Sequence, residues 1–497
     1  MFSFNKNKDS NNFRDSMDIE NDYSFVNILN ENEPSLSLKI QPLHDTIGVS
    51  AEKKTTEFCA TVTAKDLPED DSKRAPVDII VALDISGSMN GSKLDLCKST
   101  LNLLMRELSS SDRFGLVAFG SEAKVVIPVK DLTPENRDAA LMKIKNLQIA
   151  GCTNMSGGIG LAAQEIKSIS SPHEVRTMFL LTDGQANAGI SDTDGIVNLA
   201  KGCLGDEECP VPIHCFGYGS DHNRELLRDI SMVNAGGTYY YVSNDDDVSS
   251  AFGDALGGVL SVVAQNTNLT LKVPAEAANL GAQIISVRYD DVIKNADGSY
   301  SVDLKDFYAE ESRDVIFEVS LSEVYNNEPV PHVVTSMTYL DTLNSKLIQS
   351  EEMFGSICRP EGDEISPSNH HVFLQCIRIQ TTDIISESQK LADQGNFEPA
   401  RVKIRSYLEF LQKQNSVKQS SFLDQLLSEL IAIKSGLTSQ MEYKSKGSFA
   451  MQSHWMSHKR QRCNESSNIT PNFYRSSNKI LLSNKMKNKM KAGTMDK

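Results

Sequence analysis

The chain has 497 residues, which at about 150 residues per domain is enough for about three domains. Hydrophobic residues make up 39% and charged residues 23% of the sequence, values that allow real hydrophobic cores. The formal net charge of -16 argues against a general nucleic-acid binder, because such proteins need basic surfaces that neutralise phosphates. The sequence has no run of about 18 apolar residues, so we expect no transmembrane segment.

The cysteines and the N-terminal residues indicate in which cellular compartment the protein is expected. Nine cysteines are scattered without a repeated spacing, and no C-x-x-C pair is present. We therefore expect reduced, buried thiols rather than a disulfide framework or a zinc finger. The first residues contain no apolar segment of the kind that secretory signals carry, which favours a cytoplasmic protein.

The first third of the chain begins with a polar segment and then changes to strands. Residues 1–33 are rich in Asn, Asp and Ser and are expected to form a disordered tail. Residues 35–43 and 58–67 alternate apolar and polar side chains, which is typical of half-buried strands. We therefore expect a β segment over 34–75, followed by a charged linker that leads into a different pattern.

Residues 76–262 alternate buried strands with amphipathic helices. The run VDIIVALD at 77–84 is almost continuously apolar, as is typical of a strand covered by helices on both faces. Similar runs follow at 177–184 and 212–219, and Thr133 with Pro134 predicts the start of a helix. This order predicts an α/β fold, a doubly wound and mostly parallel sheet of Rossmann-like type.

The rest of the chain predicts three further segments. Residues 263–360 contain short alternating strands, with a hairpin signal at Asp297-Gly298, and predict an all-β sandwich-like module. The strands of 34–75 are expected to pair with this module, which would make the α/β domain an insertion. Helical periodicity follows at 366–440. The segment 441–497 is polar and basic and is expected to be a disordered tail, with lipid contact, RNA contact or targeting as alternatives.

Oxygen-bearing side chains follow the buried strands of the α/β domain. Asp84, Ser86 and Ser88 lie on the loop after 77–84, Thr153 lies in a glycine-bounded loop, and Asp183 ends the strand at 177–184. Open α/β sheets bind ligands at the carboxyl ends of their strands. Carboxylate and hydroxyl oxygens suit hard cations, so we expect a site for Mg²⁺, or for Mn²⁺ or Ca²⁺.

The five residues, in this order, resemble the metal-ion-dependent adhesion site of the von Willebrand factor A (vWA) domain, whose pattern is D-x-S-x-S…T…D. The resemblance covers about 77–262. It implies that Asp84, Ser86, Ser88, Thr153 and Asp183 hold the metal, and that one coordination position stays open for an acidic residue of a partner protein. Two carboxylates bring a divalent cation close to neutral, and the neutral hydroxyl ligands do not reduce its charge further. With one coordination position open, the metal therefore remains electrophilic toward an incoming carboxylate.

The flanking segments are similar to intracellular vWA proteins related to plant RING-type ubiquitin ligases. Those ligases place a RING before the vWA domain, and this sequence has no Cys/His cluster at that place. The resemblance therefore implies at most an accessory or substrate-binding component of a ubiquitin-ligase system.

Three functions compete. We favour an intracellular scaffold that uses the metal site to capture an acidic residue of a partner, and that is not an enzyme. A metal-dependent hydrolase would need a general base, and the three loops offer none. A purely structural protein localised by its tail is the third. The remaining histidines add no site, because His214 is expected to be a core or edge residue of its strand, and His370 and His371 open a helix without a partner cluster in view.

Overall fold

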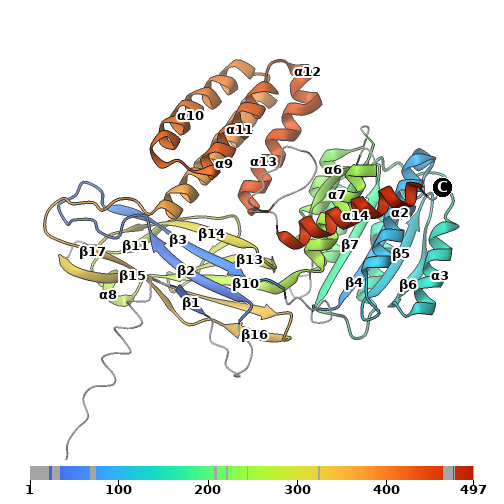
Figure 1. The fold of residues 1–497 in the computed structure, drawn as a ribbon, viewed down its shortest axis with the longest axis horizontal. Coiled ribbons are helices and arrows are strands. Elements are labelled where there is room, and N and C mark those ends of the chain that lie inside the picture. Colours follow the sequence, from blue (N-terminus) through green and yellow to red (C-terminus); the bar gives the residue numbers. More distant parts are fainter. Residues whose placement is uncertain are drawn as a thin grey trace, which may run out of the picture.

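The computed structural model describes residues 22–24, 34–67, 74–205, 210–219, 222–234, 236–242, 245–322, 325–462, 474 and 476–495. Figure 1 shows three modules: an α/β domain, a β-sandwich and a group of helices, with the last helix lying across the α/β domain. Most of the predicted N-terminal tail lies outside the described residues. Strand β1 (Asp22–Ser24) is an exception, because it pairs with β2 (Leu36–Pro42) at the edge of the sandwich.

The α/β domain is built on a six-stranded sheet in the order β6-β5-β4-β7-β8-β9. All neighbouring strands are parallel except β5 and β6, which are antiparallel. This arrangement confirms the predicted doubly wound, mostly parallel fold. The strands are β4 (Val77–Asp84), β5 (Arg113–Phe119), β6 (Ala123–Asp131), β7 (Val175–Thr182), β8 (Ile213–Tyr218) and β9 (Tyr239–Val242).

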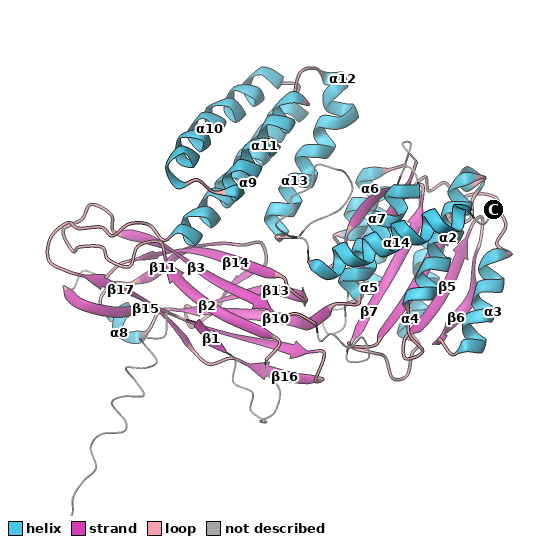
Figure 2. Ribbon diagram, viewed as in Figure 1, coloured by secondary structure: helices cyan, strands magenta, loops and turns pink. Residues whose placement is uncertain are grey.

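Helices cover both faces of this sheet, as Figure 2 shows. One face is packed by α2 (Ser92–Glu107), α3 (Pro134–Lys145) and α7 (Asp245–Val259). The other is packed by α4 (Met155–Lys167), α5 (Thr193–Leu204) and α6 (Arg224–Ser231). The predicted start of α3 is confirmed, because the Thr133 side chain accepts a hydrogen bond from the Asn136 N–H and Pro134 is the first helical residue.

The sandwich consists of two antiparallel sheets that enclose one hydrophobic core. The first has the order β1-β2-β3-β14-β11, and the second contains β12-β13-β10-β15-β16 with β17 paired to β15. The further strands are β3 (Thr55–Ala64), β10 (Val262–Lys272), β11 (Gln283–Arg288), β12 (Val292–Lys294), β13 (Tyr300–Tyr308), β14 (Ser312–Ser320), β15 (Asn326–Asp341), β16 (Lys346–Gln349) and β17 (Met353–Arg359). A short helix, α8 (Ala275–Asn279), follows β10.

The α/β domain is an insertion in the sandwich. Strand β3 precedes this domain and pairs with the whole length of β14, from Thr55 opposite Ser320 to Thr63 opposite Ser312. At the other end of the insertion, α7 is followed after two residues by β10, which lies in the second sheet of the sandwich. The two strands that flank the insertion therefore belong to the same sandwich, as the alternating patterns predicted.

The helical module begins at His370 and is longer than predicted. It contains α9 (His370–Asp393), α10 (Phe397–Lys418), α11 (Ser421–Ser435), α12 (Gln440–Glu442), the π-helical turn η3 (Tyr443–Gly447) and α13 (Ser448–Arg460). These helices share one core, to which Ile385, Leu408 and Leu430 belong.

The structure differs most from the sequence prediction at the C-terminal end. The segment from 441 on was expected to be disordered, but α13 and α14 (Ser477–Met495) account for most of its described residues. Helix α14 lies along α7 of the α/β domain (Figure 1), where the buried Lys479 Nζ lies 3.5 Å from the buried Asp254 Oδ1. This buried ion pair and the packing of Leu482 against the core of the α/β domain hold α14 in place, whereas α13 is held by the core of the helical module.

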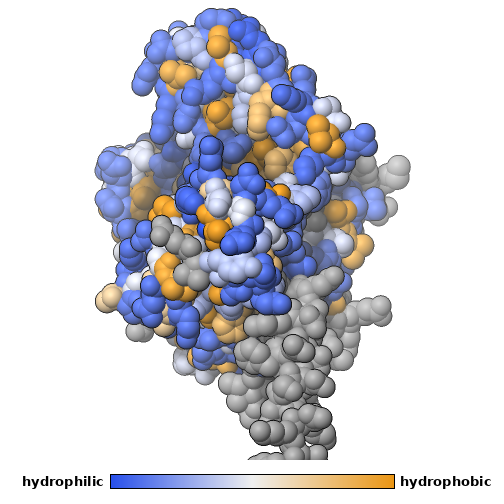
Figure 3. Space-filling model, turned by 90° about the vertical axis from the view of Figure 1, so that its left-hand side faces the viewer, coloured by the Kyte–Doolittle hydropathy of each residue, from blue (hydrophilic) through white to orange (hydrophobic). Residues whose placement is uncertain are grey.

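None of the helices in the described part of the chain has the length and apolarity that crossing a membrane needs. On the face shown in Figure 3, hydrophobic side chains form small separate groups on a largely hydrophilic surface. Single exposed apolar residues are normal on protein surfaces and do not by themselves indicate a binding site.

Candidate metal centre

The candidate site lies at the carboxyl ends of β4 and β7, the two central strands of the sheet. All eight residues of β4 are buried, and β4 is flanked by the parallel strands β5 and β7. Asp84 is the last residue of β4 and is fully buried, and Asp183 directly follows β7 and is also fully buried. Because β4 and β7 run parallel as neighbours, their last residues meet at the same edge of the sheet.

The loop after β4 is held by its own polar groups. The Ser86 N–H donates to Asp84 Oδ1 at 2.8 Å, and the Ser86 and Ser88 hydroxyl oxygens lie 3.1 Å apart. Ser86 is buried, whereas Ser88 is exposed. The loop therefore brings two hydroxyl groups together at the carboxyl edge of the sheet, one on a buried serine and one on an exposed serine.

Backbone hydrogen bonds join this loop to the Thr153 loop, and the Thr153 loop to the one after β7. The Gly87 N–H donates to the Gly151 carbonyl at 2.9 Å. The Thr153 N–H donates to Asn187 Oδ1 at 2.8 Å, and the Asn187 N–H donates back to the Thr153 carbonyl at 3.1 Å. The three loops that carry the five predicted ligands are thus fastened to one another.

Sequence reasoning missed two residues that hold the carboxylates. The Thr182 hydroxyl donates to Asp84 Oδ2 at 2.6 Å, and Lys93 Nζ lies 3.2 Å from Asp183 Oδ2. Thr182 stands beside Asp183 in the sequence, so its position at the strand end was the available signal. Lys93 belongs to the first turn of α2 and had no such signal.

The electrostatics of the site fit a cation. Burial raises the pKa of Asp84 to about 6 and the neighbouring Asp183 adds to this effect, against the hydrogen bonds from Ser86 and Thr182. Asp183 Oδ1 is buried and has no hydrogen-bond partner. A buried carboxylate oxygen without a partner is costly, and a divalent cation would satisfy it. The donor set of carboxylates and hydroxyls is the one that Mg²⁺, Mn²⁺ and Ca²⁺ prefer.

Comparison with known proteins identifies this domain. The family model for the von Willebrand factor type A domain matches residues 78–254. The chain contains a von Willebrand factor type A domain. This vWA domain is the α/β domain described above, and its core strand β4 carries the first part of the candidate metal site.

The similarity extends beyond the vWA domain. The E3 ubiquitin-protein ligase WAV3 of Arabidopsis thaliana is 25% identical over 380 residues, which are 76% of this chain and 48% of the ligase. The E3 ubiquitin-protein ligase WAVH1 of the same plant is 24% identical over 66% of this chain and 44% of the ligase. The chain is thus distantly homologous to these ligases over much of its own length, but it spans only about half of theirs.

A solved structure shows the same arrangement of modules. The von Willebrand factor type A protein from Catenulispora acidiphila superposes with a TM-score of 0.59 and covers 82% of this chain and 92% of that chain. The two sequences are 17% identical, so this likeness concerns the fold alone. The combination of a vWA domain with a β-module and a helical module therefore also occurs in a protein of very different sequence.

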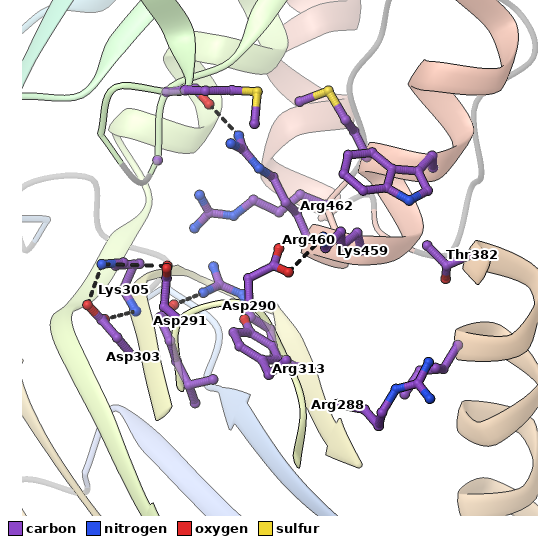
Figure 4. Close-up of a pocket in the computed structure, with 18 of the residues that line it drawn as sticks. Arg288, Asp290, Asp291, Asp303, Lys305, Arg313, Thr382, Lys459, Arg460 and Arg462 are labelled. Carbon is purple, nitrogen blue, oxygen red and sulfur yellow. Dashed lines mark hydrogen bonds and ion pairs between the residues drawn. The ribbon is translucent and has the colours of Figure 1, made fainter. Parts of the chain in front are cut away.

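A separate cavity of about 590 Å³ lies where the vWA domain, the sandwich and the helical module meet (Figure 4). Its basic side chains are tied across the modules. Lys459 Nζ of α13 lies 2.7 Å from Asp290 Oδ1 of the sandwich, and the Arg460 guanidinium donates to the Gly237 carbonyl of the vWA domain at 2.9 Å. Through these contacts α13, which forms part of the cavity wall, is bonded to both the sandwich and the vWA domain.

Proposed function

We propose that the protein is an intracellular scaffold whose vWA metal site captures an acidic residue of a partner protein. The observation that carries the proposal is the buried, unpartnered Oδ1 of Asp183, on a loop that is fastened through the Thr153 loop to the one carrying Asp84. Asp84, Ser86, Ser88, Thr153 and Asp183 would hold the cation, which would supply an electrophilic centre for a carboxylate.

The side chains around the site support binding rather than catalysis. The loops at 85–91, 150–154 and 183–191 contain no histidine and no glutamate. Hydrolysis at a metal needs a group that accepts a proton from water, and both aspartates are expected to be engaged with the cation. We therefore propose that the protein is not an enzyme.

The surroundings of the site offer room for a partner. Gly184, next to Asp183, packs close to the Asn223 backbone at the start of α6. Asn223 in turn lines a cavity of about 720 Å³ whose opposite wall is formed by the helical module, including Phe397 and Tyr443. A segment bound at the metal site could extend into this cavity and contact both modules.

The test is a comparison of binding partners with and without the metal site. Tagged full-length protein is used for affinity purification in Mg²⁺, in EDTA, and as the Asp84→Ala/Ser86→Ala variant in Mg²⁺. The matched control is Asp131→Asn, an exposed carboxylate on β6 next to Arg113 at the opposite edge of the sheet. Thermal melts of all variants show whether each remains folded.

The proposal predicts a partner that wild type and Asp131→Asn retain in Mg²⁺, and that EDTA or the double substitution releases. Retention of the same partners in all samples would mean that the metal site is not the contact. Replacing acidic residues of the recovered partner then identifies the carboxylate, and no effect of any such replacement would refute capture through an acidic residue.

A second candidate function is an accessory or substrate-binding component of a ubiquitin-ligase system. It is supported by the homology to the two plant ligases over much of this chain. With ubiquitin, activating enzyme and conjugating enzyme alone, the protein is then expected to form no ubiquitin conjugates. It is expected to increase conjugation of its metal-dependent partner when a ligase is added, and conjugation without any added ligase would contradict an accessory role.

A further inference from the structure

Three metal-binding types of side chain meet far from the vWA site, at the seam between the sandwich and the helical module. Cys59 lies on β3, Asp314 on the neighbouring strand β14, and His371 in the first turn of α9. The cysteine sulfur, one carboxylate oxygen and one imidazole nitrogen all lie within 4.8 Å of one another. Within the described residues this is the one such group of three or more His, Cys, Asp or Glu side chains.

The contacts converge on a single atom, Asp314 Oδ1. His371 Nε2 lies 2.8 Å from it, the Thr61 hydroxyl donates to it at 2.6 Å, and the Cys59 thiol donates to it at 3.4 Å. A carboxylate oxygen has about two lone-pair directions, so three partners are more than it can satisfy well. Sulfur, hydroxyl oxygen and imidazole nitrogen each have a lone pair as well, and a cation between them would use all of these.

The position of the cluster combines a protected interior with access from outside. Cys59 is 1% and Asp314 5% exposed, whereas the His371 side chain is 43% exposed. An ion can therefore enter from the histidine side. The Arg378 guanidinium is close, but it donates to the backbone carbonyl of Asp314 at 3.2 Å and leaves the carboxylate available.

The cluster is unsuited to nucleophilic catalysis. Burial, with the charge of Asp314, raises the pKa of the Cys59 thiol well above its ordinary value. Catalytic cysteines need the opposite, an accessible sulfur that is readily deprotonated. A metal ion changes this balance, because coordination displaces the thiol proton to solvent and stabilises the thiolate.

We propose that Cys59, Asp314 and His371 bind a Zn²⁺ ion that joins α9 to the sandwich. Zinc takes thiolate, imidazole and carboxylate ligands at about 2.0 to 2.3 Å, so tetrahedral ligand atoms lie roughly 3.4 to 3.6 Å apart. The sulfur already lies 3.4 Å from Asp314 Oδ1, and the imidazole nitrogen needs to move outward by about half an ångström. Water or the Thr61 hydroxyl would complete the coordination.

The combination of donors favours zinc over the metal of the vWA site. Thiolate and imidazole are borderline or soft ligands that select Zn²⁺, whereas Mg²⁺ prefers oxygen atoms only. Thiolate and carboxylate together balance the charge of the ion. The site also differs from a zinc finger, because its ligands come from three segments of the chain that are far apart in sequence.

The test uses Co²⁺ as a spectroscopic substitute for Zn²⁺. Full-length protein is freed of metal with a chelator, kept in excess Mg²⁺, and titrated with Co²⁺. Wild type is expected to develop a thiolate-to-cobalt charge-transfer band in the near ultraviolet, which one equivalent of Zn²⁺ abolishes. Competition with a chromophoric chelator gives the Zn²⁺ affinity, and circular dichroism shows that each variant is folded.

Four variants separate this site from other thiols and from the vWA site. Cys59→Ser should remove the band, and His371→Ala should lower the Zn²⁺ affinity by roughly 100-fold, because even residues behind the ligands contribute 10- to 100-fold. Cys376→Ser, on the same helix as His371, and Asp84→Ala should keep the band. Absence of the band in wild type, its persistence in Cys59→Ser, or its loss only in Asp84→Ala would overturn the proposal.

Discussion

The helical module is expected to lose stability when Glu429 is neutralised, because this buried carboxylate joins two of its helices. Glu429 lies on α11, and its Oε2 contacts His458 Nε2 at 2.6 Å and His454 Nδ1 at 3.3 Å, both on α13. The Gln425 amide donates to the other oxygen at 2.8 Å. Burial alone would raise the pKa of Glu429, but the two histidines lower it from about 4.5 to about 2.

This pKa shift sets the size and the pH range of the effect. The folded pKa lies below the unfolded one, so the stabilisation is fully present above pH 4.5 and is lost as the pH falls toward 2. A difference of about 2.5 pKa units corresponds to about 3 kcal/mol at pH 7. At pH 3 the same relation leaves about 1 kcal/mol.

The assay is urea unfolding of wild type and Glu429→Gln, followed by the fluorescence of Trp455. This is the only tryptophan of the sequence and it lies on α13, with Lys459 Nζ 4.4 Å from the centre of its ring. Its fluorescence therefore reports on the helical module. With a urea dependence of 1 to 3 kcal/mol/M, the midpoint at pH 7 should fall by about 1 to 3 M, and by clearly less at pH 3.

Glu409→Gln is the matched control, because this glutamate is exposed on α10 of the same module. It should leave the midpoint within the error of wild type at both pH values. Equal midpoints for Glu429→Gln and wild type at pH 7, or an equal loss in Glu409→Gln, would refute the assignment of the stabilisation to the buried contacts.

Two further predictions concern the vWA domain. Thr182→Val removes the hydroxyl that donates to Asp84, and should weaken Mn²⁺ binding by about 10- to 100-fold in calorimetry; an unchanged affinity would contradict this role. Gly253→Ala places a Cβ 2.5 Å from the Ser483 Cα and should release α14 to limited proteolysis, whereas Gly202→Ala, with no atom within 4 Å of its Cβ, should not.

The sequence was most informative where one short segment determines the structure. The apolar run of β4 is buried at every position, which required a strand covered on both faces, and Thr133 with Pro134 marked the start of α3. The candidate metal residues could be proposed for the same reason, since each lies at or just after the end of a buried strand, or in a loop just before a helix. The support that Lys93 and Thr182 give to the carboxylates needed the folded geometry.

The sequence was least informative where residues distant along the chain meet. His371 had no partner in view because Cys59 lies 312 positions before it, and only the pairing of β3 with β14 and the docking of α9 bring them together. The helix α14 was missed for a related reason. Of its apolar run, Ile480 and Leu481 are exposed and Leu482 packs against the vWA core, so the sequence shows no apolar stripe at helical spacing that would predict the buried face of this helix.

The docking of α14 changes how a role of the basic tail can be tested. Deleting 450–497 would remove most of α13 with α14, and with them Lys479, which pairs with Asp254 inside the vWA domain. Loss of localisation after that deletion would therefore follow equally from a damaged vWA domain. A substitution at the surface of α14 avoids this problem. Lys485 is half exposed, but the Glu107 side chain of α2 that it contacts is only 4% exposed, so a charge reversal at Lys485 would set two carboxylates against each other. Lys485→Gln instead removes a charge of the tail without adding a second carboxylate beside Glu107. Limited proteolysis of this variant shows whether α14 stays docked, which separates a role in localisation from a role in the fold.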